Sequence, residues 1–222
     1  LSDTNSKLLK ELSEKAPGTF HHSLNVANLA EAAANEIGAN AMLVRVGALY
    51  HDIGKMVNPT YFTENQSTGI NPHDELSPKE SAQIIINHVI DGIELAKKNN
   101  LPDRVIDFIR THHGSSVVYY FYNKQVESNL TFEASDFSYG GPKPFNKETA
   151  ILMMCDSVEA ASKSLKEPNS TKINNFVDAI VSKQMDSEQF LNATITLKEI
   201  QSIKKVLKHK LANMYHLRIE YP

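Results

Sequence analysis

The sequence is poor in cysteine and has no long apolar run. Cys155 is the one cysteine among 222 residues, so no disulfide can form within the chain. This usage fits a reducing compartment. No stretch approaches the ~18 consecutive apolar residues that a membrane-spanning helix requires. The hydrophobic content of 41% is nevertheless enough for one sizeable core.

A strong excess of charge of either sign is also missing. The formal net charge is -3 at pH 7, and this slightly acidic balance argues against a general binder of nucleic acid or of membrane surfaces. A substrate that carries phosphate must therefore be attracted by a local positive site. We expect no nucleic-acid polymer among the partners.

The first residues, Leu1-Ser2-Asp3-Thr4, include neither an initiator methionine nor a signal peptide. We interpret the chain as a piece of a longer protein. Length alone would allow one or two domains, and we expect a single domain over residues 1–222.

Helical patterns run through nearly the whole chain. Leu8, Leu9 and Leu12 recur at helical spacing before a break at Pro17-Gly18. Thr19 is expected to cap a second helix that runs to Gly38, and further helices are expected at 41–50, 77–98, 102–113, 146–165, 170–184 and 196–213. Residues 117–122 have β-favouring side chains but no partner strand, and we predict a buried helix there. The expected fold is all-α, with long loops at about 56–77 and 128–145 of a length that is often functional.

The first chemical signal is His51-Asp52-Ile53-Gly54-Lys55. Neighbouring side chains on a helix point about 100° apart, so His51 and Asp52 can hold one ion only where the helix is ending. Gly54 is expected to supply that ending. A solvated helix end explains this motif equally well when it stands alone.

His112-His113-Gly114 repeats the same arrangement, with two possible ligands at a helix end and then a glycine. Surface histidines near a helix C-terminus are an ordinary alternative, because the helix dipole favours a positive charge there. This motif by itself therefore does not establish a metal site.

Three more candidates lie within helices. His22 shares a face with Val26, His88 follows the apolar run 84–86, and Asp156 lies in an apolar stretch. A lone inward histidine is more often a hydrogen-bonded core residue than a ligand. A buried and unpaired aspartate is costly, however, so Asp156 needs a cation or several hydrogen-bond donors.

Taken together, these candidate residues favour a metal site over the ordinary explanation that each has on its own. Imidazole and carboxylate groups suit Zn, Fe, Mn, Co or Ni better than Mg or Ca. Seven ligands are too many for one ion, but they suit two ions about 3.5–4 Å apart that share a carboxylate. The candidate ligands are His22, His51, Asp52, His88, His112, His113 and Asp156.

These motifs resemble the HD superfamily of metal-dependent phosphohydrolases. His22, His51-Asp52 and Asp156 match the basic HD pattern, and His88 with His112-His113 matches its binuclear members. The chain is also similar to the PgpH-type cyclic-di-AMP phosphodiesterases over nearly its whole length, in the stretches 19–38, 46–55, 71–73, 76–78, 91–96, 112–114, 141–144, 147–152, 156–162 and 218–222. No Gly-Tyr-Pro motif follows His112-His113-Gly114, which argues against the related cyclic-di-GMP enzymes.

The resemblance implies an HD-domain helical bundle with a binuclear metal centre. Asp52 would bridge two divalent ions, iron or manganese; one would also bind His22, His51 and Asp156, and the other His88, His112 and His113. The implied activity is hydrolysis of the second messenger cyclic-di-AMP to linear pApA. The implied location is the cytoplasmic domain of a bacterial cell-membrane protein, in which residues 1–16 form a lead-in helix and only the missing N-terminal part contacts the membrane.

Three residues outside the ligand set are candidates for contacts with substrate. Lys55 could stabilise charge on the phosphate oxygens, although a solvated lysine is the alternative. His73 could protonate the leaving oxygen or contact substrate, or it could be an exposed loop histidine. Glu159 lies one helical turn after Asp156 and could orient a ligand or substrate, or it could be a surface carboxylate.

Other interpretations stay open. Tyr119, Tyr120 and Tyr122 could stack on adenine, although packing between helices is the favoured explanation. The chain could be an HD phosphohydrolase that acts on another nucleotide or phosphodiester. It could also be a cyclic-dinucleotide sensor without catalysis, although its complete ligand set disfavours that function.

Overall fold

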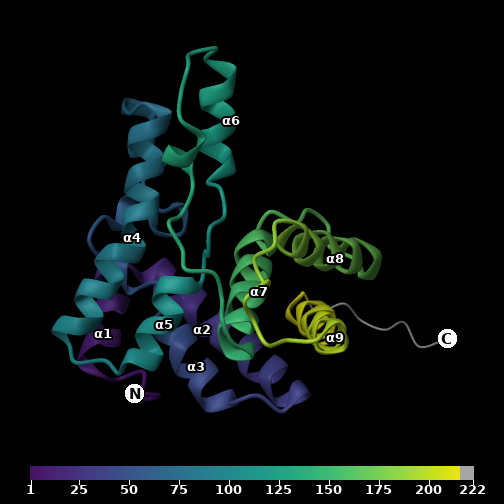
Figure 1. Cartoon of the computed structure of the whole chain (residues 1–222). Helices are drawn as coiled ribbons and strands as arrows, with labels where there is room; N and C mark the ends of the chain where they lie inside the picture. The colour runs from purple at the N-terminus through teal and green to yellow at the C-terminus, as the bar shows by residue number, and fades with distance from the viewer. Residues whose placement is uncertain (216–222) are drawn as a thin grey trace.

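Figure 1 shows the computed structural model, which describes residues 1–215. The α-helices in this range are α1 (Lys7–Lys15), α2 (Pro17–Ile37), α3 (Ala41–Tyr50), α4 (Pro78–Lys98), α5 (Asp103–Thr111), α6 (Tyr119–Glu127), α7 (Lys147–Ser162), α8 (Ser170–Asp186) and α9 (Leu197–Met214). The described residues form no strand, and their β-structure is limited to an isolated bridge between Val117 and Ser138. The predicted all-α fold is confirmed, whereas the similar stretch at 218–222 lies outside the described range.

The main core surrounds α2, which packs against α1, α3, α7 and α9. Ala27, Ala30, Ala33 and Ala34 on this helix are all completely buried. Small side chains at helical spacing let neighbouring helices approach closely, so larger side chains from those helices can fill the space between them. This packing brings α2 and α7, which lie far apart in the sequence, into direct contact.

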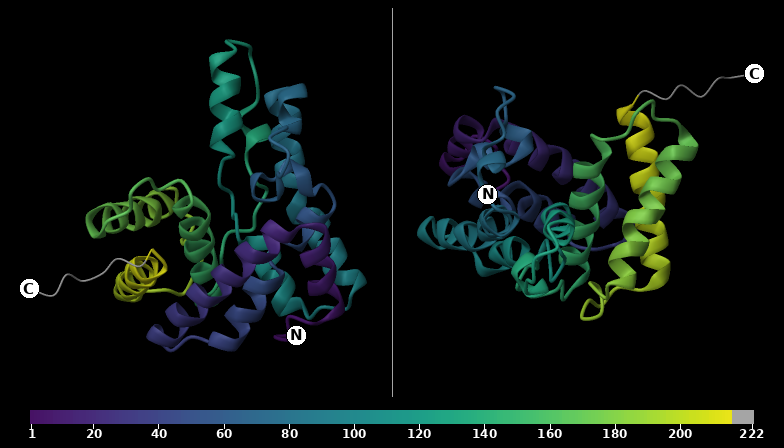
Figure 2. Two further views of the ribbon diagram at one scale, coloured as in Figure 1. Left: turned by 180° about the vertical axis from the view of Figure 1, so that it is seen from behind. Right: turned by 90° about the horizontal axis from the view of Figure 1, so that it is seen from above.

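Two helices project away from this body. In Figures 1 and 2, α4 and α6 form an arm beside the bundle, on the side away from α9. A small second core of Ala82, Phe121 and Phe137 holds the arm together. The arm is thus stabilised by local packing, while the root of α4 joins the body through contacts with α5 and the turn after α3.

The start of α2 differs from the prediction. The helix begins at Pro17, and Thr19 lies completely buried in its first turn instead of capping it. Proline suits the first helical position because it has no N–H to leave unpaired there. The Thr19 hydroxyl donates to Glu64 Oε1 at 3.1 Å, which links α2 to the loop after α3.

The segment at 117–122 was predicted only in part. Its helix, α6, begins at Tyr119, and the predicted burial is wrong for Tyr119 and Tyr120, which are 44% and 61% exposed. The reason is the projecting arm, where only one face of α6 meets α4 and the turn at 134–137.

Short 3-10 turns follow α3 and lie within both long loops. They are η1 (Ile53–Met56), η2 (Pro59–Tyr61), η3 (Thr63–Asn65), η4 (Pro72–Glu75) and η5 (Ala134–Phe137). Within the described range, no helix is both long and apolar enough to cross a membrane.

Candidate metal centre

Two helix ends carry ligand pairs into the interior, as the sequence predicts. His51 is the C-cap residue of α3, and Asp52 follows it outside the helix. His112 occupies the equivalent position at the end of α5, and Gly114 after it has a φ of 51° that favours glycine. Each helix thus ends where its last side chains turn toward the same buried point.

Gly54 was expected to end the preceding helix, but the structure gives it a different role. It lies inside η1, and a Cβ atom at this position would come within 1.8 Å of the His88 carbonyl oxygen. The absence of a side chain therefore lets η1 pack directly on α4. This close approach brings His88 next to Asp52, so Gly54 acts through packing between elements and not through helix termination.

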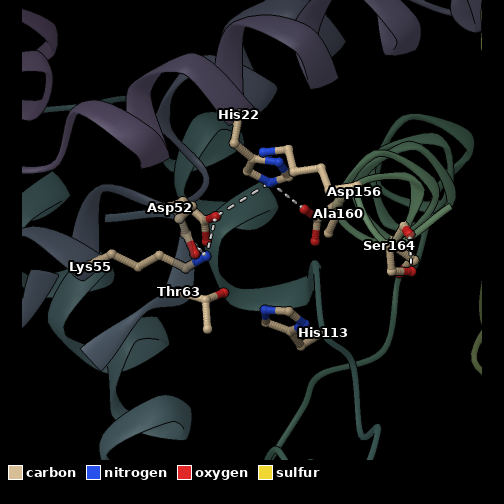
Figure 3. Close-up of a pocket in the computed structure, with 12 residues that line it drawn as sticks. His22, Asp52, Lys55, Thr63, His113, Asp156, Ala160 and Ser164 are labelled. Carbon is tan, nitrogen blue, oxygen red and sulfur yellow. Dashed lines mark hydrogen bonds and ion pairs between the residues drawn. The ribbon is translucent and has the colours of Figure 1, made fainter. Parts of the chain in front are cut away.

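The first half of the centre is formed by His22, His51 and Asp156 around Asp52 Oδ2. The Nε2 atoms of His22 and His51 lie 3.6 and 3.3 Å from Asp52 Oδ2. They lie 2.8 and 3.3 Å from Asp156 Oδ1. One ligand atom from each of the four residues falls within 4.8 Å of the others, so a single cation could bind all four. Figure 3 shows His22 facing both carboxylates.

The second half is formed by His88, His112 and His113 around Asp52 Oδ1. The Nε2 atoms of His88 and His112 each lie 3.3 Å from this oxygen and 3.2 Å from each other. His113 completes a set of four ligand atoms within 4.8 Å of one another. Asp52 therefore points one carboxylate oxygen into each half, which is the arrangement that a bridging ligand requires.

The hydrogen bonds behind the histidines leave the second half able to bind a cation. His88 and His112 donate their Nδ1 hydrogens to the carbonyl oxygens of Ile85 and Ile109. A neutral ring that donates from Nδ1 keeps a lone pair on Nε2. In that tautomer, two lone pairs and the Asp52 carboxylate face one another, and within the described residues Asp52 Oδ1 is buried without a hydrogen-bond partner.

This donor set fits a metal ion. Buried acceptors that face one another are costly unless a cation lies among them. Ring nitrogens fixed by hydrogen bonds from their other side are the usual arrangement in protein metal sites. His51 follows the same pattern, with Nδ1 bonded to the Ala48 carbonyl oxygen at 2.6 Å.

Glu159 lies behind His22, one of the candidate ligands. It is completely enclosed, with 1% of its surface exposed. One carboxylate oxygen pairs with His22 Nδ1, and the other accepts a hydrogen bond from Asn25 at 3.1 Å. The ligand-orienting alternative for Glu159 therefore agrees with the geometry, and the surface-carboxylate alternative is wrong.

The two halves differ in their electrostatics. Burial alone would lower the pKa of His22, but Asp156 and Glu159 raise it to about 9. In the same way, Asp52 and Asp156 overcome the effect of burial and raise the pKa of His51 to about 10. In the second half, burial and the neighbouring histidines hold the pKa of His113 well below its ordinary value. Without metal, the first half binds protons at neutral pH, and His113 in the second half stays neutral.

Lys55 lies beside this centre, as predicted. Its Nζ atom is 2.9 Å from Asp52 Oδ2 and 2.8 Å from Glu64 Oε1. Burial disfavours the charged amine, but Asp52 and Glu64 raise the pKa of Lys55 above its usual value, so the side chain stays cationic. Figure 3 shows its ammonium group pointing toward the ligands.

The structure does not bring His73 into the site. Its ring lies between Tyr61 and Phe121, and its Nε2 atom bonds to the Tyr61 carbonyl oxygen at 2.7 Å. It is 9% exposed, so the alternative of an exposed loop histidine is wrong. His73 holds the loop after α3 against the arm, and its predicted contact with substrate has no geometric support.

An open cavity of about 690 Å³ gives access to the metal centre. Candidate ligands from both halves line it, together with Lys55, and Ser157, Ala161 and Lys163 form the opposite wall. This volume lies within the range of roughly 300–1,000 Å³ that is typical of small-molecule sites. Sequence patterns gave no sign of the wall on α7, because its serine and alanine are ordinary helix residues.

Comparison with known proteins matches the site to one family. The model of the HD domain matches residues 19–161. The "Cyclic-di-AMP phosphodiesterase PgpH" of Listeria monocytogenes is 49% identical over 222 residues, and that of Bacillus subtilis is 45% identical. Each alignment covers the whole of this chain but 31% of the relative.

Two crystal structures of the HD domain of the Listeria monocytogenes PgpH share this fold. The first is 48% identical with a TM-score of 0.91, covering 96% of this chain and 100% of the other. The second, in complex with cyclic-di-AMP, is 49% identical with a TM-score of 0.92, covering 97% of this chain and 100% of the other.

Proposed function

The chain belongs to the HD domain family, and from this premise we propose that it is a metal-dependent phosphodiesterase that hydrolyses cyclic-di-AMP to linear pApA. The observation that carries the proposal is the position of Asp52, whose two carboxylate oxygens face two separate sets of ligands. Similarity to an HD domain in complex with cyclic-di-AMP supports this choice of substrate.

We propose that each half binds one divalent ion, iron or manganese. The first ion would bind His22, His51, Asp52 and Asp156, and the second would bind Asp52, His88, His112 and His113. Nitrogen and oxygen ligands without thiolates suit both metals. When bound, such ions polarise phosphoryl oxygens and lower the pKa of water, which makes hydrolysis possible near neutral pH.

Several side chains prepare the site for a phosphodiester. Lys55 keeps its charge at the edge of the cavity, where it can stabilise negative charge on the non-bridging phosphate oxygens. A phosphate that approached would compete with Glu64 for this ammonium group. Glu159 and the carbonyl oxygens behind His51, His88 and His112 fix the rings so that little reorganisation is needed during the reaction.

The proposed reaction consumes one water molecule for each bond that breaks. The water oxygen forms a bond to phosphorus, and the bond between phosphorus and the 3′ oxygen breaks on the opposite side. One proton from the water ends on the 3′ oxygen as the ring opens. The product carries a terminal 5′ phosphate, so the cyclic dinucleotide becomes the linear form.

We further propose that the chain acts as a single domain, the cytoplasmic domain of a bacterial cell-membrane protein. The chain spans 31% of the length of the curated relatives it matches. We therefore propose that the phosphodiesterase activity belongs to one domain of a longer protein. Residues 1–16 would then connect the domain to the preceding part of the chain.

The direct test is turnover by purified protein loaded with iron or manganese. We expect cleavage of cyclic-di-AMP to pApA, with much slower cleavage of cyclic-di-GMP and of linear dinucleotides. Faster turnover of another phosphodiester would replace the proposed substrate. If metal-loaded protein bound cyclic-di-AMP for hours without cleaving it, a sensor function would be correct instead.

A further inference from the structure

A second cavity of about 360 Å³ adjoins the metal cavity. The two share part of their lining, namely His113, Ser157 and Ala161. One of these residues is a candidate metal ligand, so a molecule held at the metal centre lies within reach of the second cavity. The remaining walls come from the first residue of α6, from Met153 on α7, from α8 and from the segment after each of α5 and α8.

The lining suits a flat, largely apolar group with a polar edge. Met153, Val117 and Ile180 supply apolar surface, and Tyr119 supplies an aromatic ring. The Lys183 Nζ atom lies 3.7 Å from the centre of that ring. A cation over an aromatic face restrains the ring, so less conformational freedom is lost when another ring stacks on it.

Gln184 is also part of the lining of this cavity. Its Nε2 atom donates to Ser157 Oγ at 2.8 Å and to the Met153 carbonyl oxygen at 3.3 Å. These contacts fix the amide orientation, because the carbonyl oxygen of Met153 can only accept. Among the described residues, Gln184 Oε1 has no hydrogen-bond partner although it is buried. This oxygen is enclosed by protein atoms, so the amide is a fixed part of the cavity wall.

From these observations we propose that the second cavity binds one base of the cyclic dinucleotide, stacked on Tyr119. The proposal rests on the proposed function, which places one phosphate at the metal centre. A cyclic dinucleotide carries two bases around one ring, so a base beside the bound phosphate must lie against a neighbouring wall. The second cavity forms such a wall, and it begins at the metal ligand His113.

The neighbouring tyrosines provide an internal comparison. Tyr119 lines the cavity, whereas Tyr120 beside it is 61% exposed and is absent from the lining among the described residues. Tyr122 packs against Phe132 and Phe137 in the small core of the arm. Packing within the arm thus explains Tyr122, whereas Tyr119 contacts α8 and lines the second cavity.

The test compares Tyr119→Ala, Tyr119→Phe and Tyr120→Ala in the metal-loaded chain. Each variant is assayed with cyclic-di-AMP and with bis(p-nitrophenyl) phosphate, a phosphodiester that has no base. Stacking on one base predicts that Tyr119→Ala raises KM for cyclic-di-AMP by roughly 5- to 150-fold. Tyr119→Phe keeps the ring and should stay close to wild type, as should Tyr120→Ala.

The ratio of kcat/KM values for the two substrates identifies the cause. A base subsite predicts that this ratio falls in Tyr119→Ala, whereas general damage to the protein would lower both activities together. Equal KM values for cyclic-di-AMP in Tyr119→Ala and Tyr120→Ala would overturn the subsite while leaving the proposed function intact. If the wild-type chain itself failed to cleave cyclic-di-AMP but cleaved the simple diester, the proposed function would fail.

Discussion

The two halves of the metal centre share Asp52 but are built differently. The first half contains a second carboxylate, Asp156, and Glu159 supports it from behind. The second half has three histidines, and backbone carbonyl oxygens hold two of them. The first half therefore contains more carboxylates, while Asp52 is the one carboxylate of the second half.

This difference predicts unequal binding of the two ions. Negative charge in the first half favours a cation, but the same carboxylates raise the pKa of His22 and His51, so protons compete for their nitrogens. The second half has weaker attraction and, with the pKa of His112 and His113 lowered, less competition from protons. We expect the first half to retain its ion more firmly once its protons have been released.

The largest effect is expected from Asp52→Ala, which removes the residue common to both halves. Both ions should be lost, and kcat should fall by roughly 10³-fold or more because metal ions supply several kcal/mol of transition-state stabilisation. Metal analysis of the purified variant checks this directly. Two ions per chain in a folded Asp52→Ala protein would contradict the bridge.

Substitution of one ligand in each half should separate the two ions. The His88→Ala variant should lose the second ion and keep the first. The His22→Ala variant should bind the first ion more weakly. His21→Ala is the matched control, because His21 is the exposed neighbour of His22. The number of ions per chain after dialysis is the measurement, and loss of both ions from His88→Ala would show that the halves do not bind independently.

A smaller and one-sided effect is expected from Glu159→Gln. The amide keeps the shape of Glu159 but removes the charge behind His22, so affinity for the first ion should fall about 10- to 100-fold. Affinity for the second ion should stay near its wild-type value. Competition with a chelator measures both, and Glu94→Gln on the exposed face of α4 serves as the control. An equal fall in both affinities would argue against a local role for Glu159.

The smallest effect is expected at Tyr139, which acts on the second half alone. Its ring stacks on His113 with centroids 4.3 Å apart and planes inclined by 13°. Tyr139→Leu removes a contact worth about 0.5–1.5 kcal/mol, which corresponds to a two- to tenfold loss of affinity for the second ion. Tyr139→Phe preserves the stack and should behave like wild type, and a comparable loss in both variants would assign the effect to the hydroxyl.

The sequence predicted most of the helices and the candidate ligands of both halves. Apolar spacing predicted most of the helices, since periodicity reports which residues share a face. The ligand types were visible as well, because buried aspartate and several inward histidines are costly without a cation. The resemblance to the HD superfamily then divided the seven ligands into two sets that share Asp52, and the structure brings both sets together.

Other features depend on contacts between distant segments. Gly54 was expected to end a helix, yet it lets η1 lie against α4. His73 lies in a long loop that could have reached the site, and packing on Tyr61 and Phe121 holds it elsewhere. The cavity beside the metal centre is formed by α6, α7 and α8, and no single segment carries its signature.

The sequence by itself determined which side chains can bind metal and which face of each helix is buried, because both depend on residue type and local spacing. The tertiary structure alone decided how the second cavity joins the first, which oxygen of Asp52 faces each half, and that Glu159 supports His22. These features depend on the angles and distances at which separate helices pack, and those are set by all the side chains between them.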